Sequence, residues 1–545
     1  MKYKLLIILL FSLFGTTHAE KFYLDPSTGN LTNAGTIDAP WSTLEAVINA
    51  NYIVSNQYSP LPYNPATSKL ISKNASGYVH AGDTLVLLNG LHGNVFLNNY
   101  INTVPITIIG MEGQTPIIEK MHLRACKNWR IENVVVSSEP YGLYLNDVLF
   151  YIESHSWQGP SSHIEVHHCE IYGTDTPWQT ADDWNTKMSN GLYIKADSVI
   201  ATNNLIRNIN FGLQAVGNYI EADHNQIINF AGDGMRIVGS NIIFKYNLIK
   251  NCYKVNDNHD DGIQSWAQIN GVVADDNQVI GNIIINTDDP SRPLNGPLQG
   301  IGCFDGFYNR WKVVNNLIVV DHWHGITFLG ANDCQIINNT VLDLTPDITP
   351  GGSWIRINNH KDGSPSSGCL VANNVANSFY VDGTLTNNVV LNTYQQYANN
   401  FIDYTNFDFH LLPTSTLIDG ADPVYAPDMD IEENGRPFGD LPDIGAYEYS
   451  SSTSSPLASD KNTFHVYPNP FSDFIIIEGN RKDYQIEIWD LSGNLIFTKS
   501  CETKAEMNQI DLSSLKKGIY FLTIKGTNNE IYKTIKLVKL MANNG

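Results

Sequence analysis

The sequence lacks several features that define common classes of protein. Beyond residue 19 no hydrophobic run approaches the roughly 18 residues that a membrane helix needs, so we expect no membrane span. Positive charge is scarce: 33 Lys and Arg stand against 55 Asp and Glu, and the formal net charge of −22 excludes nucleic acid as a partner. The seven Cys form no CxxC pair, so we expect buried packing residues and no disulfide framework.

The N-terminus has the layout of a cleavable signal peptide. Lys2 and Lys4 precede the apolar run 5–14, and Thr17-His18-Ala19 supplies a small-residue cleavage site. We therefore expect residues 1–19 to be removed and the mature protein to be exported, either secreted or held at the cell surface.

Short alternating apolar segments recur along the chain, and most of them follow a glycine. The leading residues are Gly191, Gly212, Gly234, Gly262, Gly300, Gly325 and, in place of a glycine, Trp354. An Asn follows most of them after 13 to 16 residues: Asn204, Asn225, Asn247, Asn277, Asn316 and Asn339. Parallel strands stacked with an Asn ladder at one corner and Val, Ile and Leu inside are typical of a β-helix. The pattern predicts an all-β, right-handed parallel β-helix over residues 20–449.

The spacing of the repeat also predicts where the functional face lies. The interval from each Gly to the following Asn stays nearly constant, whereas the interval from Asn to the next Gly ranges from 8 to 23 residues. We therefore expect the insertions at one edge, next to the strands that start at the glycines. One-sided insertions in a solenoid usually flank its binding face.

The C-terminal part is expected to be a separate module. A Ser-rich linker spans 450–462, and residues 463–545 alternate as the strands of a small β-sandwich. The segments Val466-Tyr-Pro-Asn-Pro-Phe and Gly518-Ile-Tyr resemble the C-terminal sorting domain of the type IX secretion system of the Bacteroidetes. That resemblance implies export by the type IX secretion machinery. A carbohydrate-binding module is the alternative for this segment.

A group of ionisable residues is predicted on the strands led by glycine. Asp233 and Asp261 each precede a Gly in neighbouring coils, which stack about 4.8 Å apart, and His259 and Asp260 adjoin Asp261. Three close carboxylates require a cation, an Arg or a shared proton. Asp233, Asp260 and Asp261 are therefore candidate ligands of Ca²⁺, which takes six to eight oxygens. Asp in a tight Asp-Gly turn is the structural alternative.

Further candidates are expected on the same outer face. Arg236 and Gln264 come two residues after their glycines, and aligned columns place Lys195, Trp266 and Phe304 two residues further on. An outward aromatic ring is explained either by stacking on a sugar or by packing beneath a loop. The remaining candidates at this edge are His324, Arg356 and His360.

The motifs Gly232-Asp-Gly and His259-Asp-Asp-Gly, together with the coils, resemble secreted β-helix polysaccharide lyases, especially calcium-dependent pectate lyases. The resemblance implies that the Asp cluster binds calcium and that a Lys or Arg abstracts a proton. Gln264 stands where a further carboxylate is expected, and no Lys occupies a clear base position. Polygalacturonase-type hydrolases are a second resemblance, through Asp233, Asp260-Asp261, His324-Gly325 and Arg356-Ile357, with Asn358 in place of their final Lys. Alginate epimerases share the fold and the proton abstraction.

The leading hypothesis is a monomeric lyase that cleaves an acidic polysaccharide, such as alginate or pectate, by β-elimination. Such a site must neutralise the uronate carboxylate, supply a base and protonate the departing oxygen. The expected catalytic residues are Arg236, His259, Asp261, His324 and Arg356, and the expected substrate-binding residues are Lys195, Gln264, Trp266, Phe304 and His360. A glycoside hydrolase, a mannuronan epimerase and a non-enzymatic glycan-binding surface protein are the alternatives.

Overall fold

A computed structural model of the chain describes residues 19–267, 273–349 and 351–450 and, in the C-terminal part, 464–467, 474–479, 484–490, 494–501, 507–512, 515–516, 518–526 and 531–539. The predicted signal peptide, up to residue 18, and the predicted linker, from residue 451, lie outside the described residues. Contacts divide the chain into two compact units, Met1–Ser451 and Ser452–Gly545.

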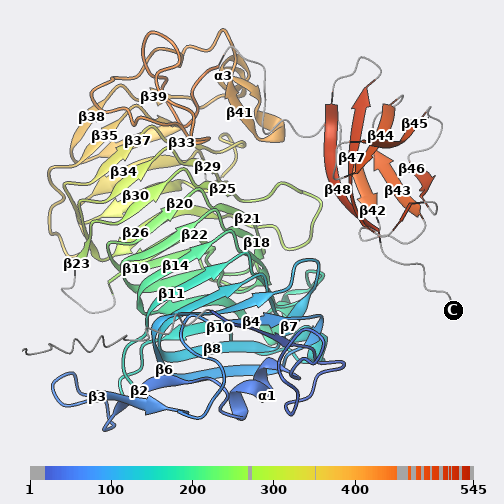
Figure 1. The fold of residues 1–545 in the computed structure, drawn as a ribbon. Coiled ribbons are helices and arrows are strands. Elements are labelled where there is room, and N and C mark those ends of the chain that lie inside the picture. The colour runs from blue at the N-terminus through green and yellow to red at the C-terminus, as the bar shows by residue number, and fades with distance from the viewer. Residues whose placement is uncertain are drawn as a thin grey trace, which may run out of the picture. The chain divides into compact units, whose positions relative to one another are not determined.

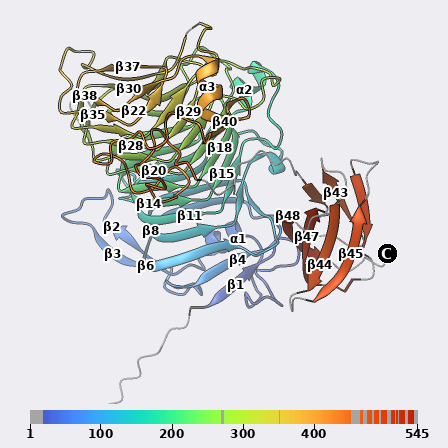
Figure 2. The ribbon, with the colours of Figure 1, turned by 90° about the horizontal axis from the view of Figure 1, so that it is seen from above.

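The first unit is a right-handed parallel β-helix, as the repeat predicted, whose coils stack in sequence order (Figures 1 and 2). Each coil contributes one strand to each of three faces, which we call faces A, B and C. Face A carries the strands led by the repeated glycines and, before and after them, strands that no glycine leads. Its strands are β10 (Val148–Glu153), β13 (Asn190–Lys195), β16 (Leu213–Asn218), β19 (Met235–Ser240), β22 (Asp261–Trp266), β26 (Gln299–Asp305), β30 (His324–Leu329), β34 (Trp354–Asn358) and β37 (Ser378–Val381).

Faces B and C close each coil. Face B holds β11 (Ser162–His167), β14 (Asp197–Thr202), β17 (Ile220–Asp223), β20 (Ile243–Lys245), β24 (Gln278–Ile280), β28 (Lys312–Val314), β32 (Gln335–Ile337), β35 (Leu370–Ala372) and β38 (Thr384–Thr386). Face C holds β5 (Gly90–Leu91), β7 (Pro116–Ile118), β9 (Val135–Val136), β12 (Glu170–Tyr172), β15 (Leu205–Ile209), β18 (Gln226–Phe230), β21 (Leu248–Cys252), β25 (Ile283–Ile285), β29 (Leu317–Val319), β33 (Thr340–Leu342), β36 (Val375–Ala376) and β39 (Val389–Val390).

Shorter elements complete this unit. The long strands β6 (Asn94–Gly110) and β8 (Lys120–Glu132) run through both faces A and B in the early coils. The N-terminal elements are β1 (Lys21–Leu24), α1 (Leu44–Asn49), β2 (Ser55–Ser59), β3 (Lys69–Lys73) and β4 (Thr84–Leu87). The others are α2 (Ala181–Lys187), β23 (Val273–Asp275), β27 (Phe307–Asn309), β31 (Ala331–Asn332), α3 (Tyr394–Asn400), β40 (Phe401–Asp403) and β41 (Asp408–Leu411), with 3₁₀ turns at Glu139–Tyr141 and Tyr404–Asn406.

The repeated glycines have a steric cause. A Cβ built on Gly212 would lie 2.3 Å from the carbonyl oxygen of Gly234 in the next coil, and one on Gly300 would lie 2.1 Å from the carbonyl oxygen of Gly325. Neither distance leaves room for a side chain. The coils from Gly191 to Gly325 therefore need glycine where face A begins, and this requirement produces the repeat in the sequence.

An Asn ladder links the coils, as predicted, with one correction. The Nδ2 of Asn204 donates to Oδ1 of Asn225 at 2.8 Å, and Asn225 donates to Asn247 at 2.9 Å. Asn247 then donates to Asn282 at 2.8 Å, so the prediction that Asn277 belongs to this ladder is wrong. Asn277 lies at the preceding corner, where its Oδ1 accepts from the backbone N–H of Ile242.

Because Asn282, and not Asn277, belongs to the ladder, the insertions lie at other places than the sequence predicted. The interval from Gly262 to its ladder Asn is lengthened by residues 267–275, which include β23. A second insertion, 359–369, separates β34 from β35. Insertions therefore flank face A at both ends of its strands, and the expectation that they gather at the start alone is wrong.

Apolar side chains fill the interior of the helix, including Leu192, Leu213, Ile237 and Ile301, all fully buried. Six of the Cys are buried and free, as expected from their scattered spacing: Cys126, Cys169, Cys252, Cys303, Cys334 and Cys369. No helix in the described part of the chain combines the length and apolarity that crossing a membrane requires.

The second unit has two antiparallel sheets, which agrees with the predicted sandwich. One sheet holds β42 (Phe464–Tyr467), β43 (Phe474–Gly479) and β46 (Met507–Asp511); the other holds β44 (Tyr484–Asp490), β45 (Leu495–Cys501), β47 (Gly518–Gly526) and β48 (Ile531–Lys539). One apolar core joins them, with Ile475 and Ile510 from the first sheet and Ile486 and Leu522 from the second.

Candidate functional site

The register of face A brings the predicted columns together. Gln214, Arg236, Gln264 and Gly302 lie opposite one another on four successive strands, and Asp261 lies opposite Gln299. One expected alignment is wrong: Trp266 lies opposite Asp305, not Phe304, because the register shifts after Ser265. The column around Arg236 thus forms a continuous row on the outer surface of face A.

Asp233 and Arg236 form the first ion pair of the site. The Nε of Arg236 donates to Oδ2 of Asp233 at 2.6 Å, and its Nη1 donates to Gln214 at 3.1 Å. The guanidinium lies 3.4 Å from the ring centroid of Phe211 and 5.2 Å from that of Trp266. Burial raises the pKa of Asp233, and Arg236 opposes that rise. The two rings hold Arg236 in one orientation.

The inserted loop that ends at β22 supplies further ionisable groups, among them Lys254 and Asp260. It is anchored at Tyr253, whose ring lies 4.8 Å from that of Trp184, and at the carbonyl of Val255, which accepts from Asn185 of α2. Beyond this anchor, Lys254 Nζ contacts Oδ2 of Asp260 at 3.4 Å. Asp260 is 2% exposed, and burial raises its pKa to about 7 although Lys254 opposes the rise.

His259 and Asp261 form a dyad at the end of this loop. Nδ1 of His259 lies 3.5 Å from Oδ2 of Asp261, and the amide of Gln264 donates to the same oxygen at 3.1 Å. The contact with Asp261 raises the pKa of His259 above 6.5, whereas burial raises the pKa of Asp261 to about 7. Asp261 is fully buried, but the His259 side chain is 65% exposed. The buried carboxyl therefore orients an imidazole that solvent and ligands can reach.

Two carboxyl oxygens at the centre have no hydrogen-bond partner among the described residues. They are Oδ1 of Asp260 and Oδ1 of Asp261, both buried. A Cβ on Gly302 would lie 2.4 Å from Oδ1 of Asp261 and 2.5 Å from the Phe304 ring, so only glycine lets these two side chains approach the strand here. Buried polar atoms without a partner are costly, so both oxygens are candidates for a contact with a bound ligand or water.

Calcium binding by this Asp cluster stays a prediction. Ca²⁺ takes six to eight oxygens, yet among the described residues no group of three or more His, Cys, Asp or Glu side chains is arranged to hold a metal ion. Each Asp of the cluster instead contacts a different basic side chain: Arg236, Lys254 or His259. The Arg and Lys supply the counter-charge that close carboxylates need, so no step below is routed through calcium.

His324 and its neighbours form a second group two strands further along face A. Nδ1 of His324 contacts Oγ1 of Thr327 at 2.9 Å, and its ring packs against Phe304 at 4.9 Å and His322 at 5.2 Å. Burial lowers the pKa of His324 to about 3 and that of His322 to about 4. Both imidazoles are therefore neutral at neutral pH, and neither is a strong base.

The remaining predicted site residues lie away from the Asp cluster. Arg356 is on β34, three strands beyond β22 and so about 14 Å along the axis, where its Nε donates to Asn358. His360 contacts Phe307 at 4.5 Å and Asp362 at 2.9 Å on the insertion after β34. Lys195 lies three strands before β22, at the end of β13.

Two cavities open beside the cluster and share its central residues. One of about 190 Å³ is lined by Phe211, Gly232, Asp233, Arg236, Asn258, His259, Asp260 and Gln264. The other, of about 240 Å³, is lined by Lys254, Asp257, Asn258, His259, Asp260, Pro297, Gln299 and His322. His259 and Asp260 line both. A ligand in the first cavity meets a guanidinium, an amide and an accessible imidazole.

Sequence reasoning missed two residues of this site. Lys254 precedes Asp260 by six residues in an irregular loop, where spacing does not determine contact. Phe211 precedes Gly212 as Asp233 precedes Gly234, but its role as a platform for Arg236 depends on side-chain orientation. The position of Phe211, next to a repeated Gly on the coil before Asp233, is the one signal that could have identified it.

The fold and the site define a right-handed parallel β-helix with a cluster of buried carboxyls and basic side chains on one face. Residues 465–539 match the family model of the secretion system C-terminal sorting domain. The protein is therefore exported by type IX secretion to the cell surface or beyond, as the sequence predicted. No curated protein matches the chain as a sequence relative.

Three solved structures illustrate what the chain resembles. Pectate lyase Pel9A is 14% identical over 80% of this chain and 98% of that one, with a TM-score of 0.42. PfbA, a surface adhesin of Streptococcus pneumoniae, is 11% identical over 56% and 80%, with a TM-score of 0.34. The A-module of the Azotobacter vinelandii mannuronan C-5 epimerase AlgE4 is 10% identical over 56% and 88%, with a TM-score of 0.33. Likenesses this distant carry no statement about activity, so the function must rest on this chain's own residues.

Proposed function

We propose that the protein is an exported polysaccharide lyase that cleaves an acidic, uronate-containing glycan such as alginate or pectate by β-elimination without calcium. The observation that carries this proposal is the cavity that Arg236, Gln264 and His259 line together. It combines a fixed positive charge, a hydrogen-bond donor and an accessible base, which are the groups that β-elimination requires.

Arg236 is suited to neutralising the substrate carboxylate. Its Nε and Nη1 are occupied by Asp233 and Gln214, and its Nη2 makes no hydrogen bond with a described residue. The guanidinium, which the Phe211 ring already holds in place, would form an ion pair with a uronate carboxylate bound there and offset its negative charge. Neutralisation makes the adjacent C–H proton more acidic and stabilises the enolate-like transition state.

His259 is suited to removing that proton. Nδ1 of His259 lies 3.5 Å from Oδ2 of Asp261, so the other ring nitrogen is left to act as base toward the cavity. The electron pair of the broken C–H bond forms the C=C bond, and the glycosidic C–O bond breaks with its electrons going to oxygen. Asp260 is suited to protonating this oxygen, because a carboxyl group with a pKa of about 7 is still partly protonated at neutral pH.

A glycoside hydrolase is the second candidate, and one specific observation favours it. Asp260 and Asp261 are adjacent carboxyls that both have a pKa of about 7, so one can be protonated while the other is ionised. An acid and a base of this kind are what hydrolysis of a glycosidic bond requires.

One assay distinguishes these reactions. The purified protein is incubated with alginate, pectate and neutral glycans, and both the ultraviolet absorbance of unsaturated sugar ends and the number of new reducing ends are followed. Lyase activity gives both signals in parallel on an acidic glycan, with no effect of EDTA. Reducing ends without absorbance would exclude the lyase and support the hydrolase, and neither signal would leave an epimerase or an adhesin.

A further inference from the structure

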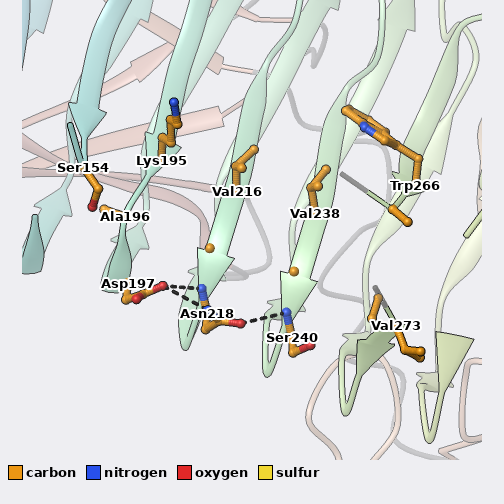
Figure 3. Close-up of a pocket in the computed structure, with 14 residues that line it drawn as sticks. Ser154, Lys195, Ala196, Asp197, Val216, Asn218, Val238, Ser240, Trp266 and Val273 are labelled. Atoms are coloured by element: carbon orange, nitrogen blue, oxygen red, sulfur yellow. Dashed lines mark hydrogen bonds between the residues drawn. The ribbon is translucent and has the colours of Figure 1, made fainter. Parts of the chain in front are cut away.

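A third cavity, of about 320 Å³, lies near the C-terminal ends of the face A strands. It crosses four successive strands, β13, β16, β19 and β22, and so runs along the axis of the β-helix. Figure 3 shows Lys195 and Trp266 near its two ends, with Val216 and Val238 between them. We call this cavity the axial groove. Strands stack about 4.8 Å apart, so its ends are about 14 Å apart, the span of a short oligosaccharide.

Two glycines give the axial groove its depth. Gly217 and Gly239 lie opposite each other on β16 and β19, with φ of 156° and 148°. A Cβ on Gly239 would lie 1.8 Å from the carbonyl oxygen of Gly217, and one on Gly217 would lie 2.1 Å from that of Ala196. Any other residue would collide with the backbone, so this part of the surface carries no side chains.

One rim of the groove is held by hydrogen bonds between coils. Oδ1 of Asp197 accepts from the backbone N–H of Asn218 at 2.8 Å and from its Nδ2 at 3.2 Å. Oδ1 of Asn218 accepts from the backbone N–H of Ser240 at 3.3 Å, as Figure 3 shows. The rim therefore exists before any ligand arrives, which lowers the entropy cost of binding.

Lys195 places a positive charge in a strongly acidic protein. Its side chain is exposed and forms no ion pair with a described residue. Glu153, which lies opposite it on β10, is occupied by His122 at 2.9 Å and Arg124 at 2.7 Å. The ammonium group of Lys195 thus faces an apolar groove and can pair with an anionic ligand.

Trp266 connects the axial groove with the candidate catalytic centre. Its ring lines the groove, and the guanidinium of Arg236 lies 5.2 Å from its centroid. A sugar chain that leaves the cavity of Arg236 and His259 would meet this indole first and Lys195 last. An indole face is a suitable platform for the C–H face of a pyranose ring.

We propose that the axial groove binds an acidic oligosaccharide along the helix axis, with a pyranose ring on Trp266 and a sugar carboxylate on Lys195. The bound chain extends from the catalytic centre toward the N-terminal coils. This inference rests on the proposed function and deepens it, because it assigns the path of the substrate and the residue that selects for its charge.

The test measures binding by the full chain carrying His259→Ala, so that turnover does not interfere. The probes are trigalacturonate and its methyl ester, which has no charge, and the method is isothermal titration calorimetry. Lys195→Ala is expected to weaken binding of trigalacturonate about tenfold or more and to leave the ester unaffected. Trp266→Ala should weaken the binding of both trigalacturonate and the methyl ester. Lys312→Ala, a change of an exposed lysine on face B, is the matched control and should alter neither.

The possible outcomes distinguish the proposed binding in the axial groove from the proposed lyase reaction. Equal affinities of the Lys195→Ala and Lys312→Ala proteins for trigalacturonate would refute binding in the axial groove, even if the wild-type protein cleaves pectate. The absence of any binding of trigalacturonate would overturn it as well. Binding that depends on Lys195, together with no unsaturated product from any acidic glycan, would support the groove and refute the lyase. Melting temperatures of all variants establish that each is folded.

Discussion

Asp260→Asn should make the protein more stable and less active at the same time. Asp260 is 2% exposed, and burial raises its pKa from 3.8 to about 7. Because the folded-state value is the higher one, the native state keeps a proton that the unfolded chain releases. The stability associated with this proton is complete below pH 3.8 and is lost as the pH rises toward 7. The interval between the two pKa values corresponds to at most about 4 kcal/mol.

An Asn at position 260 cannot ionise, so the variant avoids this loss. We expect its free energy of unfolding to exceed that of the wild type by up to about 4 kcal/mol near pH 8, less the contact that Lys254 forfeits, and the gain to vanish near pH 4. Urea unfolding followed by tryptophan fluorescence measures both values. Lyase activity should fall about 100-fold, because the departing oxygen loses its acid.

Asp276→Asn is the control for this prediction. Asp276 is exposed, and Arg310 lowers its pKa, so its replacement removes a favourable contact and should bring no gain near pH 8. The reasoning is refuted if Asp260→Asn is no more stable than the wild type near pH 8, or if its gain is equally large near pH 4.

Three further predictions follow from the site and the ladder. His259→Ala should lower kcat about 100-fold while leaving the melting temperature nearly unchanged, because this side chain is 65% exposed; a loss of stability that matches the loss of activity would contradict this. The plot of kcat/KM against pH should be bell-shaped, since a neutral His259, with a pKa raised above 6.5, and a protonated Asp260, with a pKa of about 7, are both required; a flat profile from about pH 5 to 9 would exclude the pair. Asn316→Ala should cost about 3 kcal/mol or more in urea unfolding, because its buried amide bonds to Val279 and Asn339, whereas Asn388→Ala at the partly buried end of the ladder should cost less.

Much of the fold could be predicted from the sequence because its cause is local. From Gly191 to Gly325 the face A strands begin where a Cβ would collide with the next coil, so a glycine leads each of these strands. Asn277 was misassigned because Asn occupies more than one corner of this helix, and composition alone does not distinguish the corners. The hydrogen bond from Asn247 to Asn282 identifies the true ladder residue of this coil, and only the structure shows that bond.

The candidate site was predictable in its centre and not at its margins. Arg236, Asp261 and Gln264 lie on regular strands, and Asp233 lies two residues before β19, so counting residues gives their neighbours. Lys254 lies in an irregular loop whose path depends on packing against α2, so its contact with Asp260 has no sequence signal. The calcium expectation came from the predicted proximity of three carboxyls and from the resemblance to calcium-dependent pectate lyases, and it stays a prediction; the basic partners of the three Asp argue for testing it by chelation.

The central claim is that the site cleaves an acidic glycan by elimination, and the mass of the product tests it most directly. The purified protein is incubated with alginate or pectate in water enriched in ¹⁸O, and the oligosaccharides are examined by mass spectrometry. The account predicts unsaturated ends, each lighter than a hydrolysed end by one water, and no ¹⁸O incorporated by cleavage. Saturated products that carry one ¹⁸O for each bond cleaved would contradict it.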